Sequence, residues 1–152
     1  MTSVLVTFRA ESEHRETLTK ALGNASRIVF LSDVSPQNRA KELSDAEVLI
    51  SWSVKEELRP EEFKLLDHAK MLQLLSAGVD HLPFNDLPLG LMIASNAGAY
   101  AEPMAEHAVA MILATTKNLF DRQMKLRNGI FDQTNVNRML RGSLVQSWVS
   151  VV

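Results

Sequence analysis

Apolar residues in this chain occur in short continuous runs that are separated by polar, helix-forming segments. Five runs are predicted to be strands, and they lie at residues 3–8, 27–31, 47–51, 71–75 and 91–94. Because these runs do not alternate with polar residues, both faces of the sheet must be covered, which is typical of parallel strands with helices on each side. Helices are predicted from Ser12 to Leu22 and after Ser35-Pro36 and Arg59-Pro60. Residues 1–98 are therefore predicted to form a doubly wound α/β domain.

The segment after residue 100 has a different pattern. Residues 103–114 form a predicted helix with almost no polar stripe, and an amphipathic continuation reaches Asn128-Gly129. A helix that is apolar all round is buried on all sides. We therefore expect this helix to lie between two domains or two subunits, and we expect a homodimer through residues 101–140.

Composition restricts the class of protein. The chain has 152 residues, 16 Lys and Arg against 18 Asp and Glu, and no cysteine, so disulfide frameworks and thiolate metal sites are excluded. No apolar run approaches the ~20 residues that span a bilayer, and no basic segment precedes the first apolar run. We expect a cytoplasmic protein with no membrane partner. Residues 117–152 are basic but poor in aromatic side chains, which argues against a nucleic-acid partner.

Several blocks of sequence together resemble the D-isomer-specific 2-hydroxyacid dehydrogenase family, which includes phosphoglycerate dehydrogenases and hydroxypyruvate reductases. The blocks are Leu75–His81, Ser95–Tyr100, Met104–Ala108, Asp121–Met124 and Asn137–Gly142. Their order and spacing make the resemblance specific, and it covers nearly the whole chain.

The resemblance implies a two-domain NAD(P)-dependent enzyme. Residues 1–98 would be its flavodoxin-like substrate-binding domain, and residues 99–152 the linking helix and the start of a Rossmann nucleotide-binding domain. The glycine fingerprint and the catalytic Arg, Glu and His of the family have no counterpart in this sequence, so no catalytic residue is assigned here. Glu106 and His107 resemble the family's pair on the linking helix, which is not the catalytic couple.

The resemblance also assigns binding residues. Ser76, Gly78 and Val79 follow the fourth predicted strand, where the family holds the substrate carboxylate with backbone N–H groups. Trp52 and Ser53 follow the third strand. Family members often carry a basic residue at the position of Trp52, so a phosphorylated substrate is disfavoured and a small or apolar 2-keto acid is favoured. Alternatively, Trp52 is a core residue.

Two residues are candidates for contact with the NAD or NADP cofactor. Ala77 and Met104 occupy positions that touch the nicotinamide in the family, although a Met near a helix start is also common packing. No spacing of His, Asp and Glu indicates a metal site.

The last residues depart from the family pattern. Gln146–Val152 has no glycine, whereas the family has Gly-x-Gly-x-x-Gly there. Back-translation of this segment in a shifted frame allows such a string. We therefore expect that a one-base deletion near codon 146 changed the ending, which the nucleotide sequence would decide.

The sequence thus predicts a fragment of an oxidoreductase that acts on a D-2-hydroxyacid or its 2-keto acid and that is inactive alone. The alternative is a non-enzymatic flavodoxin-like module that binds a small acid or dimerises. A flavin is disfavoured because the segment after the first strand, residues 8–11, carries Glu11 and is free of glycine.

Overall fold

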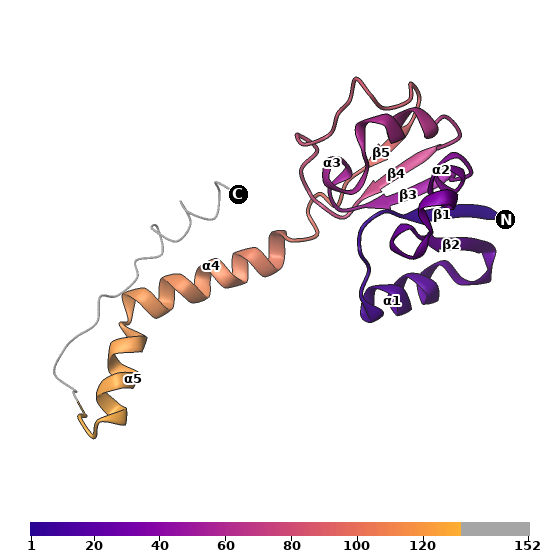
Figure 1. The fold of residues 1–152 in the computed structure, drawn as a ribbon. Coiled ribbons are helices and arrows are strands. Elements are labelled where there is room, and N and C mark those ends of the chain that lie inside the picture. The colour runs from indigo at the N-terminus through magenta and orange to yellow at the C-terminus, as the bar shows by residue number, and fades with distance from the viewer. Residues whose placement is uncertain (132–152) are drawn as a thin grey trace. The chain divides into compact units, whose positions relative to one another are not determined.

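A computed structural model describes residues 1–131 of the chain. Residues 1–97 contain a five-stranded sheet in which every pairing is parallel, with the strand order β2-β1-β3-β4-β5 (Figure 1). The strands are β1 (Thr2–Val6), β2 (Ser26–Phe30), β3 (Val48–Ser51), β4 (Met71–Leu74) and β5 (Met92–Ala94). This is the flavodoxin-like order. The prediction of a doubly wound parallel α/β fold is confirmed.

The two faces of the sheet are covered unequally. Helix α1 (Ser12–Leu22) packs on one face, over a small core that includes Val4, Val6 and Ile50. The other face carries the larger core, which receives side chains from α2 (Pro36–Ser44), α3 (Val54–Glu57) and the 3₁₀ helix η3 (Pro60–Leu65). Two further 3₁₀ turns, η1 (Gly23–Ala25) and η2 (Leu31–Asp33), flank β2.

One connection differs from the predicted one, and the connection from β4 to β5 is irregular. The helix expected after Arg59-Pro60 is the six-residue 3₁₀ helix η3, because Phe63 and Leu66 enter the core there within a single short segment. No helix forms in the connection from β4 to β5, which instead packs Leu82 and Leu87 into the larger core. Buried leucines on an irregular segment therefore cover this part of the larger core.

The chain divides into two compact units, and the second begins at Gly98. Its described elements are α4 (Ala101–Thr116) and α5 (Leu119–Arg127). The predicted continuous helix is interrupted at Asn118, whose φ of 49° is left-handed. A left-handed residue ends one helix before the next begins, and Asn tolerates that conformation better than most residues.

Neither helix of this unit buries a side chain in the single chain. Burial of α4 between domains or subunits therefore stays a prediction. The expected start of a Rossmann domain toward the end of residues 99–152 and the segment Gln146–Val152 lie outside the described residues. Within residues 1–131, every helix is too short or too polar to cross a bilayer.

Candidate functional site

The carboxyl ends of β1, β3 and β4 lie side by side at one edge of the sheet. The N–H of Thr7 donates to the Ile50 carbonyl at 3.0 Å, and the N–H of Leu75 donates to the Ser51 carbonyl at 2.9 Å. The strand order reverses between β1 and β3, and open α/β sheets bind ligands at such a switch point, beyond the carboxyl ends of their strands. The segments that follow β3 and β4 are the two that the sequence selected.

The segment after β4 is held in place from several directions. The N–H of Asn96 donates to the Ser76 carbonyl at 3.0 Å, and the Ser76 hydroxyl donates to the Gly78 carbonyl at 3.1 Å. Farther along, Leu82 and Leu87 are buried in the larger core. The loop is therefore short, internally bonded and anchored at both ends.

Neighbouring backbone donors in this loop face solvent. Gly78 and Val79 are exposed, and their N–H groups have no protein acceptor within residues 1–131. The Val79 carbonyl accepts from the N–H of Leu82 at 3.0 Å, so the backbone on the other side of this residue is fixed. The loop presents two neighbouring N–H donors that are free to bond an acceptor from solution.

Gly78 makes room for a carboxylate of its own chain. A Cβ atom placed on Gly78 would lie 2.7 Å from Oδ1 of Asp80, which is closer than a real Cβ contact. A side chain at residue 78 would therefore require the exposed carboxylate of Asp80 to move aside. The φ angle of Gly78 is not left-handed, so the backbone itself does not call for glycine here.

The Trp52–Ser53 segment is organised by a residue that the sequence did not point to. The Glu57 carboxylate accepts the N–H of Trp52 at 3.0 Å through Oε1 and the N–H of Ser53 at 2.7 Å. Its Oε2 accepts the hydroxyls of Ser51 at 2.6 Å and Thr7 at 2.5 Å.

The capping-box pattern would have selected a different acidic residue. In that pattern a Glu three positions after the N-cap serine reaches back to the backbone, and Glu56 stands three positions after Ser53. The tertiary contact with Thr7 on β1 accounts for the use of Glu57 instead.

Trp52 and Ser53 themselves differ in burial. The Trp52 side chain is half exposed, with 50% of its surface accessible, so the alternative reading of Trp52 as a core residue is wrong for this chain. Ser53 is half buried and begins α3. What these residues offer to a ligand is the indole face and the serine hydroxyl, because Glu57 already takes both of their N–H groups.

A largely buried ion pair contacts the backbone of Glu57. Arg39 on α2 bonds both carboxylate oxygens of Glu62 on η3, at 2.5 and 3.0 Å, and also donates to the Glu57 carbonyl at 3.0 Å. The N–H of Arg59 donates to Glu62 at 2.9 Å. These bonds, with that from Arg39 first, lower the pKa of Glu62.

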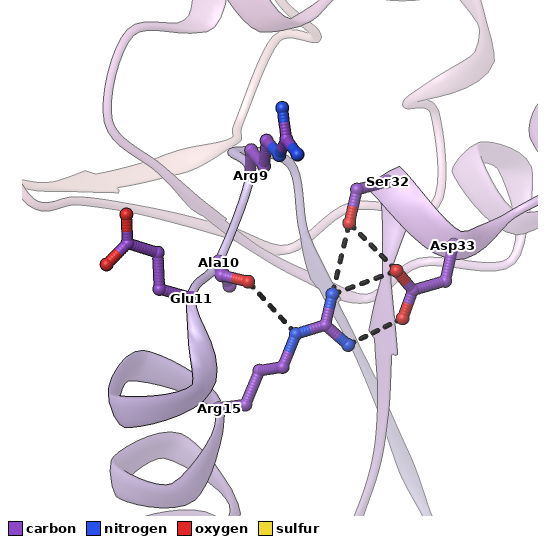
Figure 2. Close-up of a pocket in the computed structure, with 6 residues that line it drawn as sticks. All are labelled: Arg9, Ala10, Glu11, Arg15, Ser32 and Asp33. Carbon is purple, nitrogen blue, oxygen red and sulfur yellow. Dashed lines mark hydrogen bonds and ion pairs between the residues drawn. The ribbon is translucent and has the colours of Figure 1, made fainter.

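A separate open cleft of about 780 Å³ lies at the ends of β1 and β2. Its lining residues are Arg9, Ala10, Glu11, Arg15, Ser32 and Asp33. Figure 2 shows Arg15 bonding Asp33 through two nitrogens, at 2.6 and 2.8 Å, while the side chains of Arg9 and Glu11 point away from that pair.

The ion pair in this cleft is structural. Arg15 also lies over the Phe30 ring, 4.2 Å from its centroid, and thereby ties α1 to β2. The hydrogen bond from Arg15 lowers the pKa of Asp33. The pair is exposed, so its effect on stability is small. Sequence reasoning did not select this cleft, because its two charged partners lie 18 residues apart.

The two predicted cofactor contacts are both exposed. Ala77 lies in the loop after β4, and Met104, with 62% of its surface accessible, lies on α4. Glu106 and His107 are exposed on α4. His81 is half buried beside the β4 loop, and its Nε2 is covered with no hydrogen-bond partner within residues 1–131.

Solved structures that match the chain include several dehydrogenases. One is a glycerate dehydrogenase related protein from Thermoplasma acidophilum, with 30% identity and a TM-score of 0.61; the match covers 89% of this chain and 42% of that one. A D-isomer specific 2-hydroxyacid dehydrogenase family protein from Aeromonas salmonicida subsp. salmonicida has 16% identity and a TM-score of 0.70; the match covers 93% of this chain and 44% of that one.

A third match is D-lactate dehydrogenase from Aquifex aeolicus, complexed with NAD and lactic acid. It has 20% identity and a TM-score of 0.67, and the match covers 99% of this chain and 48% of that one. The chain spans less than half the length of these three structures. No family model matches the sequence, and no curated protein sequence matches it.

These matches bear on both the fold and the family resemblance of the chain. The fold is the parallel α/β fold of a dehydrogenase domain. The resemblance to D-isomer-specific 2-hydroxyacid dehydrogenases and related enzymes is confirmed, since proteins of that description are among the solved structures that match most of this chain.

Proposed function

We propose that residues 1–98 are the acid-binding domain of an NAD(P)-dependent oxidoreductase. Its reaction interconverts the CH–OH group of a D-2-hydroxyacid and the carbonyl of the corresponding 2-keto acid. The observation that carries this proposal is the pair of exposed N–H donors at Gly78 and Val79, at the carboxyl edge of a sheet that is similar to dehydrogenase structures.

These donors suit a carboxylate ligand. Adjacent N–H groups give charge-assisted hydrogen bonds to a carboxylate without a side-chain cation. In this proposal Ser76 holds the loop through its bond to the Gly78 carbonyl, and Ser53 supplies a hydroxyl at the neighbouring strand end. The exposed indole of Trp52 favours a small or apolar acid over a phosphorylated one.

The residues at hand also fit contact with a nicotinamide ring. Ala77 and Met104 present exposed apolar surface, which is what a van der Waals contact with the ring requires. A bound NAD or NADP would supply or accept the hydride. The part assigned to residues 1–98 is to bind the acid and orient its reacting carbon, and no proton transfer is assigned to a side chain here.

We further propose that the protein forms a homodimer through residues 101–140, of which the structure describes 101–131. Helix α4 exposes large apolar side chains, including Met104, Met111 and Leu113. Contiguous apolar surface of this kind is uncommon on monomers in water.

Nuclear magnetic resonance with the ¹⁵N-labelled 152-residue chain tests the proposed acid site. Pyruvate and D-lactate are expected to shift the amide signals of Gly78 and Val79, and acetate to shift them less because it lacks the second oxygen function. V79P removes one N–H donor together with its amide signal and is expected to abolish the shift of the Gly78 signal, whereas the matched variant V79A keeps the donor and the response.

The same preparation separates binding from turnover. The printed chain, assayed alone with NADH and pyruvate, is expected to show no oxidation of NADH. Measurable turnover would contradict the expectation that this chain is inactive alone, and unmoved Gly78 and Val79 signals at saturating pyruvate would refute acid binding.

A further inference from the structure

The densest polar contacts at the switch point surround a single carboxylate, that of Glu57. It receives the hydroxyls of Thr7 and Ser51 and the backbone N–H groups of Trp52 and Ser53, all within 3.0 Å of one of its oxygens. Thr7 and Ser51 are themselves buried, with 7% and 1% of their surfaces accessible. One side chain therefore joins the ends of β1 and β3 to the start of α3.

The rest of the Glu57 residue is also fixed. Its carbonyl accepts from Arg39, which is bonded to Glu62, and its sequence neighbour Leu58 is buried. The Glu57 side chain therefore has little conformational freedom, because its backbone is fixed and its carboxylate accepts four hydrogen bonds. The Trp52–Ser53 backbone is consequently tied to the sheet edge and not left as a free loop.

This arrangement has a consequence for ligand binding. Without Glu57, the N–H groups of Trp52 and Ser53 would be a second pair of donors beside those of Gly78 and Val79. An acid could then bind in more than one orientation. With Glu57 in place, the Trp52–Ser53 pair is closed to a ligand carboxylate, whereas the N–H groups of Gly78 and Val79 have no acceptor within residues 1–131.

We propose that Glu57 is a positioning residue of the acid site. It fixes the Trp52–Ser53 segment and directs the ligand carboxylate to Gly78 and Val79. This inference rests on the proposed function for its ligand, whereas the positioning of Trp52 and Ser53 rests on the contacts alone.

The test compares E57A with E56A in the ¹⁵N-labelled 152-residue chain. Glu56 is the exposed neighbour on the same short helix, so E56A removes an equal charge without touching the network. In E57A the amide signals of Trp52 and Ser53 are expected to move and to exchange faster with water, because their acceptor is gone. Pyruvate binding at Gly78 and Val79 is expected to weaken about tenfold, the loss that corresponds to ~1.4 kcal/mol.

Chemical rescue gives a readout that a merely structural role would not produce. Added formate, a free carboxylate small enough for the vacated position, is expected to return the Trp52 and Ser53 signals toward their original positions in E57A and to have no effect in E56A. Should E57A fail to fold, E57Q replaces it. The glutamine amide keeps the shape of the side chain, but its NH₂ group faces hydrogen-bond donors that the carboxylate accepted.

The outcomes separate the two proposals. Unchanged Trp52 and Ser53 signals in E57A, or unchanged pyruvate affinity when those signals do move, would overturn the role of Glu57. If the unaltered chain does not bind pyruvate, the proposed function fails, and movement of the Trp52 and Ser53 signals with formate rescue still decides whether Glu57 fixes this segment.

Discussion

The sheet domain and helix α4 are both rich in apolar residues, but the sheet domain buries these side chains and α4 exposes them. In the sheet domain, Leu5, Leu49 and Leu72 each keep 1% of their surface accessible. On α4, Leu113 keeps 40% and Met111 keeps 58%. The sheet domain contains the surfaces that cover its apolar side chains. Helix α4 carries an apolar sequence whose large side chains stay exposed within residues 1–131, which is the basis for proposing that it packs on another surface.

The largest expected difference between the two regions is in core packing. L72A removes a side chain that is buried in the larger core, and it is expected to lower the free energy of unfolding by about 3 kcal/mol. L113A makes the same change on α4, and it is expected to change the unfolding of the sheet domain by less than about 0.5 kcal/mol. Urea unfolding followed by circular dichroism measures both, and equal losses would contradict the comparison.

A smaller effect is expected from the buried ion pair of the sheet domain. E62Q breaks the bidentate contact with Arg39 and is expected to cost about 2 kcal/mol of unfolding free energy at neutral pH. The pKa of Glu62 is lowered by Arg39 from its ordinary value of 4.5, so its stabilisation is present above that value and is lost as the pH falls through the folded pKa.

The pH dependence is the sharper part of that prediction. The difference between the unaltered chain and E62Q, measured by urea unfolding, should be largest at neutral pH and should shrink steadily below pH 4.5. E61Q, at the exposed neighbouring position, is the control and is expected to show no such trend. A difference that persists undiminished in acid would mean that packing, and not charge, holds this segment.

A charged side chain introduced on α4 is expected to have the smallest effect on the unfolding of the sheet domain. Its expected effect on the proposed dimer is large. M111E is expected to leave the unfolding of the sheet domain unchanged and to convert dimers to monomers, because a carboxylate would be desolvated in the apolar contact. A21E places the same charge on exposed α1 and is expected to leave the dimer intact. Light scattering after size-exclusion chromatography measures both; a soluble monomer of the unaltered chain would refute the dimer.

Most of the sheet domain could be predicted because its strands are continuous apolar runs with short, polar interruptions. The predicted strand 71–75 is β4 within one residue, and the predicted helix Ser12–Leu22 is α1. The conversion of the segment after Arg59-Pro60 to a 3₁₀ helix could not be predicted, since it depends on where Phe63 meets the core.

The candidate site divides in the same way. The segments after β3 and β4 were selected from residue types and from the rule that ligands bind at the carboxyl ends of parallel strands. Glu57 was missed, because the local capping-box pattern points to Glu56 instead. Its role arises from Thr7, which is 50 residues away in sequence and adjacent in space only after β1 pairs with β3.

The sequence by itself determined the strands, the parallel α/β class and the loop that offers backbone donors. These features could be predicted because they depend on residues that are neighbours in the sequence, such as apolar runs and a glycine after a strand. The tertiary structure alone decided which N–H groups remain open to a ligand. Hydrogen bonds between residues distant in sequence form only when strand pairing brings them together, and at this edge the Glu57 carboxylate takes one pair of donors and leaves the other exposed.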